Sequence, residues 1–197
     1  MRGHGGVAAP PLRRGERDGR AALVAARPSH LRAVTRFCST CGARLDEPPP
    51  TTCAACGTAH YLNPKPCGGA LLVSDGRLLL ARRAIEPWLG RWDIPGGFCD
   101  QREHPREAAE RELLEETGVR GRAKRLVGMW LDDYTSGEVC LNIYYEVEPV
   151  GDATPSGSDE VSELRWFAPD ELPLDEISFP AHCRDVLETW VRQQRVG

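Results

Sequence analysis

Two apolar runs separated by a short polar stretch predict a β-hairpin in the first half of the chain. The runs are GGALLV at 68–73 and RLLLARRA at 77–84, and SDG lies between them. Asp75 and Gly76 favour the tight turn that joins two antiparallel strands. The sequence therefore predicts two paired strands with a turn at these two residues.

The second half of the chain combines further predicted strands with a helix. Apolar segments that predict strands lie around 123–131, around 139–147 and at ELRWF, 163–167. The last predicted element is an amphipathic helix over about 180–195. Because strands and helices are interspersed, we expect an α/β fold in which they pack in layers.

The stretch PGGFCDQREHPREAAERELLEETGV combines helix signals with a high density of acidic side chains, since seven of its 25 residues are Asp or Glu. Pro105 suits the first turn of a helix, and Gly118 suits the position that ends one. On such a helix Glu112 and Glu116 are one turn apart, and Glu115 lies on the same side. The pattern therefore predicts a helix with three carboxylates on one side.

Each pair of like charges on an isolated helix costs about a few tenths of a kcal/mol, so this crowding predicts a cation nearby. Carboxylate oxygens suit hard divalent ions such as Mg²⁺ or Mn²⁺, which commonly bridge to substrate phosphates. The alternative is a solvated acidic face that is paired locally by Arg106 and Arg111.

Four of the eight cysteines form two pairs, Cys38 with Cys41 and Cys53 with Cys56, and 11 residues separate the pairs. Four thiolates can converge into the tetrahedral site that Zn²⁺ accepts, and they leave no position for a water molecule. We therefore predict a structural zinc ion. His60 is a spare candidate ligand, although with four sulfurs present an ordinary polar role is the simpler interpretation.

The remaining cysteines and the bulk composition indicate no further chemistry. The cysteines that we assign no role are Cys67, Cys99, Cys140 and Cys183. A hydrophobic content of 41% can supply a core, and a net charge of -4 does not favour nucleic acid as the partner. No run approaches the roughly 18 apolar residues that a membrane helix needs, so we expect no membrane partner and a cytoplasmic protein.

Residues 1–36 carry eight arginines and two acidic residues with almost no apolar periodicity, which predicts a disordered basic tail. Two alternatives stay open for this segment: an arm that contacts nucleic acid, and translation that begins near Val34. We place the zinc ribbon at 37–63 and the α/β domain at 64–197.

The acidic segment also resembles the Nudix box of the Nudix hydrolases, whose pattern is G-x5-E-x7-R-E-L-x-E-E-x-G-V. Every fixed position is filled: Gly97, Glu103, Arg111, Glu112, Leu113, Glu115, Glu116, Gly118 and Val119. The resemblance implies an α/β/α sandwich with a mixed sheet, preceded here by the zinc ribbon. It further implies an enzyme that hydrolyses a nucleoside diphosphate linked to another group, with Mg²⁺ or Mn²⁺ as catalytic cofactor.

The resemblance also implies roles for the residues of the box. Glu112, Glu115 and Glu116 would bind the metals, and the Gly97 carbonyl is a further possible ligand. Glu103 would assist at the metal site, and Arg111 would hold the glutamates through salt bridges. Leu113 and Val119 would belong to the core.

Two features remain open within this family. Members often take the general base from the box or from a later loop, so Glu115 and Glu160 are equal candidates here. The aromatic side chain that stacks on the base is one of four candidates: Trp88, Trp92, Trp130 and Tyr134.

A four-cysteine ribbon, the linker HYLNPKP and a Nudix domain together resemble the zinc-ribbon branch, which includes NADH pyrophosphatases and ADP-ribose or FAD pyrophosphatases. The SQPWPFPxS-type stretch of the NADH enzymes is missing after the box. We therefore expect ADP-ribose or FAD as substrate, with NADH or a nucleoside triphosphate as the alternative. A non-catalytic nucleotide-sensing regulator that binds partners through its ribbon is the alternative of another class. The family frequently dimerises, so a homodimer is possible.

Overall fold

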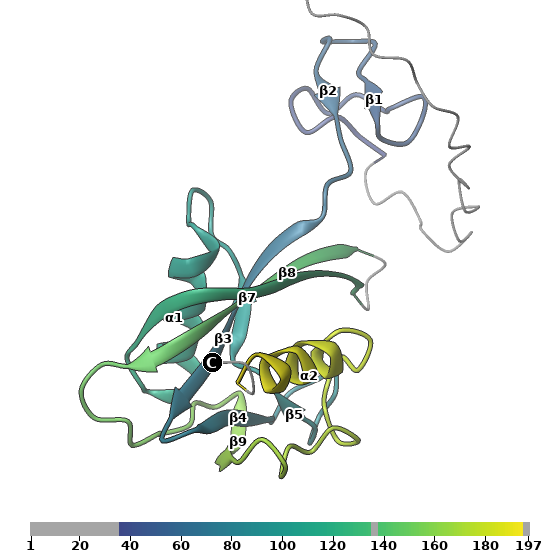
Figure 1. The fold of residues 1–197 in the computed structure, drawn as a ribbon. Helices are drawn as coiled ribbons and strands as arrows, with labels where there is room; N and C mark the ends of the chain where they lie inside the picture. The colour runs from purple at the N-terminus through teal and green to yellow at the C-terminus, as the bar shows by residue number, and fades with distance from the viewer. Residues whose placement is uncertain (1–35, 135–137, 195–197) are drawn as a thin grey trace, which may run out of the picture.

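The computed structural model describes residues 36–134 and 138–194 of the chain. The tail expected at 1–36 lies outside the described residues except for its last position. A small two-stranded ribbon precedes a larger domain that contains one sheet and two helices (Figure 1).

The large sheet has seven strands and is mixed. They are β3 (Lys65–Ser74), β4 (Arg77–Arg83), β5 (Trp92–Asp93), β6 (Gly96–Phe98), β7 (Gly121–Asp133), β8 (Val139–Pro149) and β9 (Val161–Phe167). The order is β5-β4-β3-β8-β7, while β6 pairs with β3 and β9 pairs with β4. Only the β3–β8 pair is parallel among these strands. The fold is therefore the expected α/β class with a mixed sheet.

The predicted hairpin is confirmed. Strands β3 and β4 pair antiparallel, with Ser74 opposite Arg77. Asp75 and Gly76 between them have φ angles of 50° and 71°, which is the left-handed region that a two-residue hairpin turn of this type requires.

The predicted acidic helix is α1 (Pro105–Thr117), which begins at Pro105 and ends before Gly118 as the sequence predicts. The N-cap is His104, whose Nδ1 accepts a hydrogen bond from the Arg106 backbone N–H at 3.1 Å. Gly118 adopts φ 69° at the C-terminal end and donates its N–H to the Leu114 carbonyl at 2.9 Å. Local chemistry therefore fixes the length of this helix.

The sheet has a hydrophobic core on each face, one under each helix. The core under α1 contains Ala70, Leu72, Leu79, Ala109, Leu113, Val119 and Val147. The core under α2 (Cys183–Gln194) contains Leu71, Leu78, Leu80, Val186, Leu187 and Trp190. Adjacent residues of β3 and β4 thus point to opposite faces, which makes the domain a sandwich of helix, sheet and helix.

A glycine allows α1 to lie directly against the sheet. A Cβ atom at Gly68 would lie 2.3 Å from the Pro105 carbonyl oxygen and 2.7 Å from the Ala109 backbone nitrogen. The absence of a side chain at Gly68 therefore allows the first turns of α1 to lie close to β3, next to the segment that contains β6.

The structure adds elements that the sequence pattern does not predict. Strands β5 and β6 contain only two and three residues. The last helix begins at Cys183 rather than near residue 180. Neither helix in the described part of the chain has the length and apolar character needed to cross a membrane.

Candidate active site and metal centres

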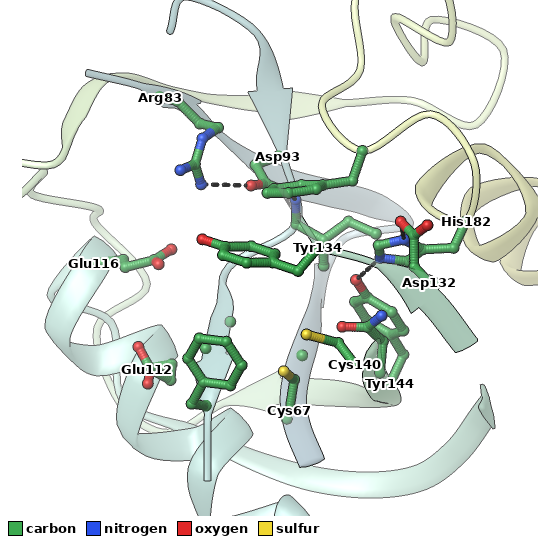
Figure 2. A pocket seen from close by; sticks show the side chains of 18 of the residues that line it. Cys67, Arg83, Asp93, Glu112, Glu116, Asp132, Tyr134, Cys140, Tyr144 and His182 are labelled. Carbon is green, nitrogen blue, oxygen red and sulfur yellow. Dashed lines mark hydrogen bonds and ion pairs between the residues drawn. The ribbon is translucent and has the colours of Figure 1, made fainter. Parts of the chain in front are cut away.

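A cavity of about 370 Å³ lies between α1, the sheet and the segment that precedes α2. Glu112 and Glu116 line one side of it, and Asp132, Tyr144 and His182 line the opposite side (Figure 2). The volume falls within the range of pockets that bind small organic molecules.

The acidic side of the cavity contains carboxylates whose charge the neighbouring basic side chains do not fully neutralise. Burial, together with the nearby carboxylates of Asp93 and Glu112, raises the pKa of Glu116 to about 8. Burial likewise raises the pKa of Glu112, although Arg111 opposes that shift. A cation bound here would stabilise both carboxylates in their charged form.

Arg111 links α1 to the segment that precedes it along the chain. Its Nε and Nη2 donate to the two oxygens of Glu103 at 2.8 Å each. Its Nη1 donates to Glu112 at 2.8 Å and to Glu115 at 3.1 Å, while Nη2 also donates to the Phe98 carbonyl at 3.1 Å. One guanidinium group therefore positions three glutamates and the backbone of β6.

Two of the predicted site residues do not line the cavity. Glu115 is 58% exposed at its side chain and pairs with Arg111. Glu103 also points to Arg111, whose hydrogen bonds lower the pKa of Glu103 to about 2. The structure thus separates Glu112 and Glu116 in the cavity from Glu103 and Glu115 outside it.

Gly97 and Glu160 both line the cavity. A Cβ atom at Gly97 would lie 2.4 Å from Oε1 of Glu112, so the carboxylate packs against bare backbone. The two glutamates in the cavity and the Gly97 carbonyl supply only oxygen donors, and such a set fits Mg²⁺ or Mn²⁺. Among the described residues, the carboxylates do not converge as closely as the four cysteines do.

An ion pair that sequence reasoning missed borders the acidic side. Arg83 of β4 donates from Nη1 to Asp93 of β5 at 2.9 Å, and both side chains are largely buried. The guanidinium group also lies over the Phe179 ring at 5.3 Å. The pair forms because β4 and β5 are neighbouring strands. Nothing in the sequence signals this contact, because β5 contains only two residues.

Aromatic rings line another part of the cavity. The rings of Tyr134 and Phe179 are 6.0 Å apart at an angle of 17°, and Phe98 meets Tyr134 edge-on at 5.8 Å. Of the four aromatic candidates from the sequence, only Tyr134 lines the cavity. The three tryptophans do not line it: Trp88 and Trp130 pack against the lining residues Phe179 and Tyr144, and Trp92 packs against Phe167.

A buried chain of three polar side chains closes the side opposite the glutamates. Asp132 and His182 Nδ1 are 2.7 Å apart, and His182 Nε2 and the Tyr144 hydroxyl are 2.9 Å apart. Tyr144 fits there because Gly69 leaves room, since a Cβ atom at Gly69 would lie 2.2 Å from the ring. Cys67 and Cys140 also line the cavity, and burial raises the pKa of each thiol.

The cysteine pairs converge in the ribbon as the sequence predicts. Strands β1 (Thr51–Thr52) and β2 (Ala59–His60) pair, and the four Sγ atoms lie within 4.8 Å of one another. The Cys38 and Cys56 sulfurs are 3.6 Å apart, and those of Cys41 and Cys53 are 3.7 Å apart. Tetrahedral Zn²⁺ with sulfur at 2.3 Å requires about 3.8 Å between sulfurs, so the geometry fits zinc.

His60 is placed beside this cluster. Its Nε2 is 3.3 Å from the Cys38 sulfur, and the residue is buried. A backbone hydrogen bond from Cys41 is the main cause that lowers the pKa of Cys38 to about 5. Although a backbone hydrogen bond from Ala43 opposes the shift, the Cys56 thiol and burial raise the pKa of Cys41 to about 12, so a bound cation is needed for thiolate at both positions. His60 thus contacts a candidate ligand and is not an isolated surface residue.

Comparison with known proteins agrees with this architecture. A "MutT-like protein" of Streptomyces ambofaciens is 33% identical over 115 residues, which cover 58% of this chain and 70% of that protein. An "ADP-ribose pyrophosphatase" of Methanocaldococcus jannaschii is 31% identical over 115 residues, which cover 57% and 67%. The crystal structure of a NUDIX hydrolase from Nitrosomonas europaea superposes with a TM-score of 0.70 at 28% identity, covering 83% of this chain and 94% of that one. The family profile named NUDIX domain matches residues 65–185, and the chain therefore belongs to the NUDIX family.

Proposed function

We propose that this Nudix pyrophosphohydrolase cleaves the diphosphate linkage of nucleoside diphosphate derivatives, with ADP-ribose or FAD as the preferred substrate. The observation that carries the proposal is one cavity in which Glu112 and Glu116 face an aromatic wall. A diphosphate needs the cation-binding side, and a planar base fits against aromatic rings.

Different residues would bind the cation, hold its ligands in place and present positive charge to the diphosphate. Glu112, Glu116 and the Gly97 carbonyl would hold Mg²⁺ or Mn²⁺, which would neutralise phosphate oxygens and orient the attacking water. Arg111 Nη1 donates a hydrogen bond to the Glu112 carboxylate at 2.8 Å and so holds it in position. Arg83, held by Asp93 at 2.9 Å, presents its positive charge to the same cavity.

Glu160 is the candidate general base that the geometry supports better. It lines the cavity, whereas Glu115 is held outside by Arg111. A base must come within hydrogen-bond reach of the water whose proton it takes, and only a residue in the cavity meets that condition.

Two observations support ADP-ribose or FAD over NADH. The chain resembles a relative named ADP-ribose pyrophosphatase over 67% of that protein. The stretch after the box reads RGRAKRLVGMWLDDYTSGEV and lacks the SQPWPFPxS-type element of NADH pyrophosphatases.

A direct competition tests the proposal. ADP-ribose, FAD and NADH at equal concentration are incubated with the protein and Mg²⁺ or Mn²⁺, and the products are separated by chromatography. We expect AMP with ribose 5-phosphate or FMN, and a lower kcat/KM for NADH. A clear preference for NADH or for a nucleoside triphosphate contradicts the substrate assignment, and failure to cleave any of these compounds contradicts the enzymatic proposal.

A further inference from the structure

The side chains of β8 alternate between the two faces of the sheet. One set belongs to the core under α1 or packs against it: Leu141, Ile143, Tyr145 and Val147. The other set lines the cavity: Cys140, Asn142 and Tyr144. Asn142 is therefore a polar residue of the cavity lining, between Cys140 and Tyr144 on the same face of β8.

The Asn142 amide is buried without a partner. The residue is 9% exposed, and its Nδ2 has no hydrogen-bond acceptor among the described residues. Ser178 Oγ is the other buried side-chain polar atom without a partner in the described part of the chain, but Ser178 does not line the cavity. A buried donor that stays unpaired is unfavourable, so a partner from outside the protein would satisfy it.

The neighbouring polar groups are already engaged with one another. His182 uses both ring nitrogens, one with Asp132 at 2.7 Å and one with the Tyr144 hydroxyl at 2.9 Å. The residues opposite Asn142 in the sheet are Cys67 on β3 and Trp130 on β7. Nδ2 is shielded from solvent in its present orientation, but the side chain lines the cavity, so rotation of the amide turns the donor toward a ligand there.

The shape of the site indicates what that ligand presents. Tyr134, Phe179 and Phe98 form an aromatic wall of the same cavity, which suits a flat ring. A carboxamide offers a donor and an acceptor side by side, and this pair matches the N7 acceptor and the N6 amino donor of adenine.

We infer that Asn142 is a specificity-determining residue that reads the adenine edge, with its Nδ2 donating to N7. This inference rests on the proposed function, because it assigns the base end of the same substrate. The diphosphate then extends from the base toward Glu112 and Glu116.

The contact is tested by removing the N7 atom of the nucleotide and the amide of Asn142, separately and together. Binding of ADP and of 7-deaza-ADP, which lacks the N7 acceptor, is measured by calorimetry in Mg²⁺ with the wild type and with Asn142→Leu. The wild type should bind ADP tighter than 7-deaza-ADP by about tenfold or more, since a bidentate amide contact discriminates at that level. Asn142→Leu should bind both compounds equally weakly. The control Glu188→Gln, on α2 and outside the cavity lining, should keep the wild-type ratio.

Three results would overturn the inference. The first is an Asn142→Leu variant that keeps the wild-type ratio of affinities for ADP and 7-deaza-ADP, and the second is a wild type that does not bind ADP measurably. The third is a melting temperature of nucleotide-free Asn142→Leu that lies several degrees below that of the wild type. The last result would show that the amide has a structural partner. Hydrolysis of ADP-ribose and of FAD is assayed in parallel. Asn142-dependent ADP binding without hydrolysis of either compound would contradict the proposed function and leave this inference standing.

Discussion

Glu116 differs from the other three glutamates at fixed positions of the box in having no basic partner at hydrogen-bond distance among the described residues, while Glu103, Glu112 and Glu115 all contact Arg111. It is also largely buried beside Asp93 and Glu112, which raises its pKa to about 8. A carboxylate in this position has the most to gain from a bound divalent ion.

Glu116→Gln should therefore lower turnover of the best nucleotide by about 100-fold or more, because one charge is lost from the cation site while the side-chain volume is kept. Circular dichroism and the melting temperature should show that the fold persists. Glu188→Gln on the exposed part of α2 is the matched control and should retain full activity. Near wild-type turnover of the Glu116 variant would mean that the cation site lies elsewhere.

Glu160 and Glu115 can be separated by the same kind of substitution. Because Glu160 lines the cavity and Glu115 does not, Glu160→Gln should lower kcat by about 100-fold, within the range for loss of a general base. Glu115→Gln should have the smaller effect. Profiles of kcat against pH for both variants provide the measurement, and a greater loss in Glu115→Gln reverses the assignment.

At the scale of elements, α1 and β3 form the contact that places the acidic residues. Gly68 permits this contact, since a Cβ atom there would collide with the backbone of Pro105 and Ala109. Backbone atoms of a capped helix cannot move aside as a flexible side chain can, so the helix as a whole would have to shift.

Gly68→Ala should consequently destabilise the protein by about 1–3 kcal/mol, the usual cost of overpacking. Urea unfolding followed by tryptophan fluorescence measures this change. Gly157→Ala is the milder comparison and should cost less, because its Cβ would come no closer than 3.2 Å to a backbone oxygen and its φ is ordinary. Equal stability of Gly68→Ala and wild type would show that the helix does not depend on this close approach.

The same elements show what the sequence could predict. The hairpin and α1 were predictable because Asp75, Gly76, Pro105 and Gly118 act on their immediate neighbours. Strands β5 and β6 were not, because two or three residues have too little periodicity to signal a strand.

The cavity wall was beyond sequence reasoning for a different reason. Asp132 and His182 are 50 positions apart and meet only when the segment before α2 packs against β7. The unpaired amide of Asn142 is likewise visible only once the surrounding side chains are placed. Local patterns identified the acidic side of the site, and long-range packing formed the other side.

At the scale of the whole molecule, the ribbon and the sheet domain have separate cores. The ribbon core consists of Cys38, Leu45 and Cys53, with Ala43 packed against it. Apolar contact is so limited there that the bound metal would supply most of the stability of the ribbon. Structural zinc provides about 10 to 16 kcal/mol of apparent binding free energy in zinc-finger peptides at neutral pH.

Purified protein should accordingly contain about one zinc per chain, as a single four-sulfur site holds one ion. Removal of this zinc by a strong chelator, or Cys53→Ser, should unfold the ribbon while the sheet domain keeps its melting temperature. Metal analysis and hydrogen exchange measure the two effects. His60→Ala should release zinc faster, because the contact of His60 with the Cys38 sulfur is lost. Absence of zinc, or a single cooperative collapse of both parts, would contradict this division.

The two sides of the cavity are encoded differently along the chain, and this difference affects how the protein can diverge. Glu112, Glu116 and Gly97, which would hold the cation, occupy one short segment, 97–116, which recombination can transfer as a block. The opposite wall is assembled from positions scattered between 132 and 182. A duplicated gene can therefore change which molecule is recognised through single substitutions in that wall, without altering the segment that would hold the cation.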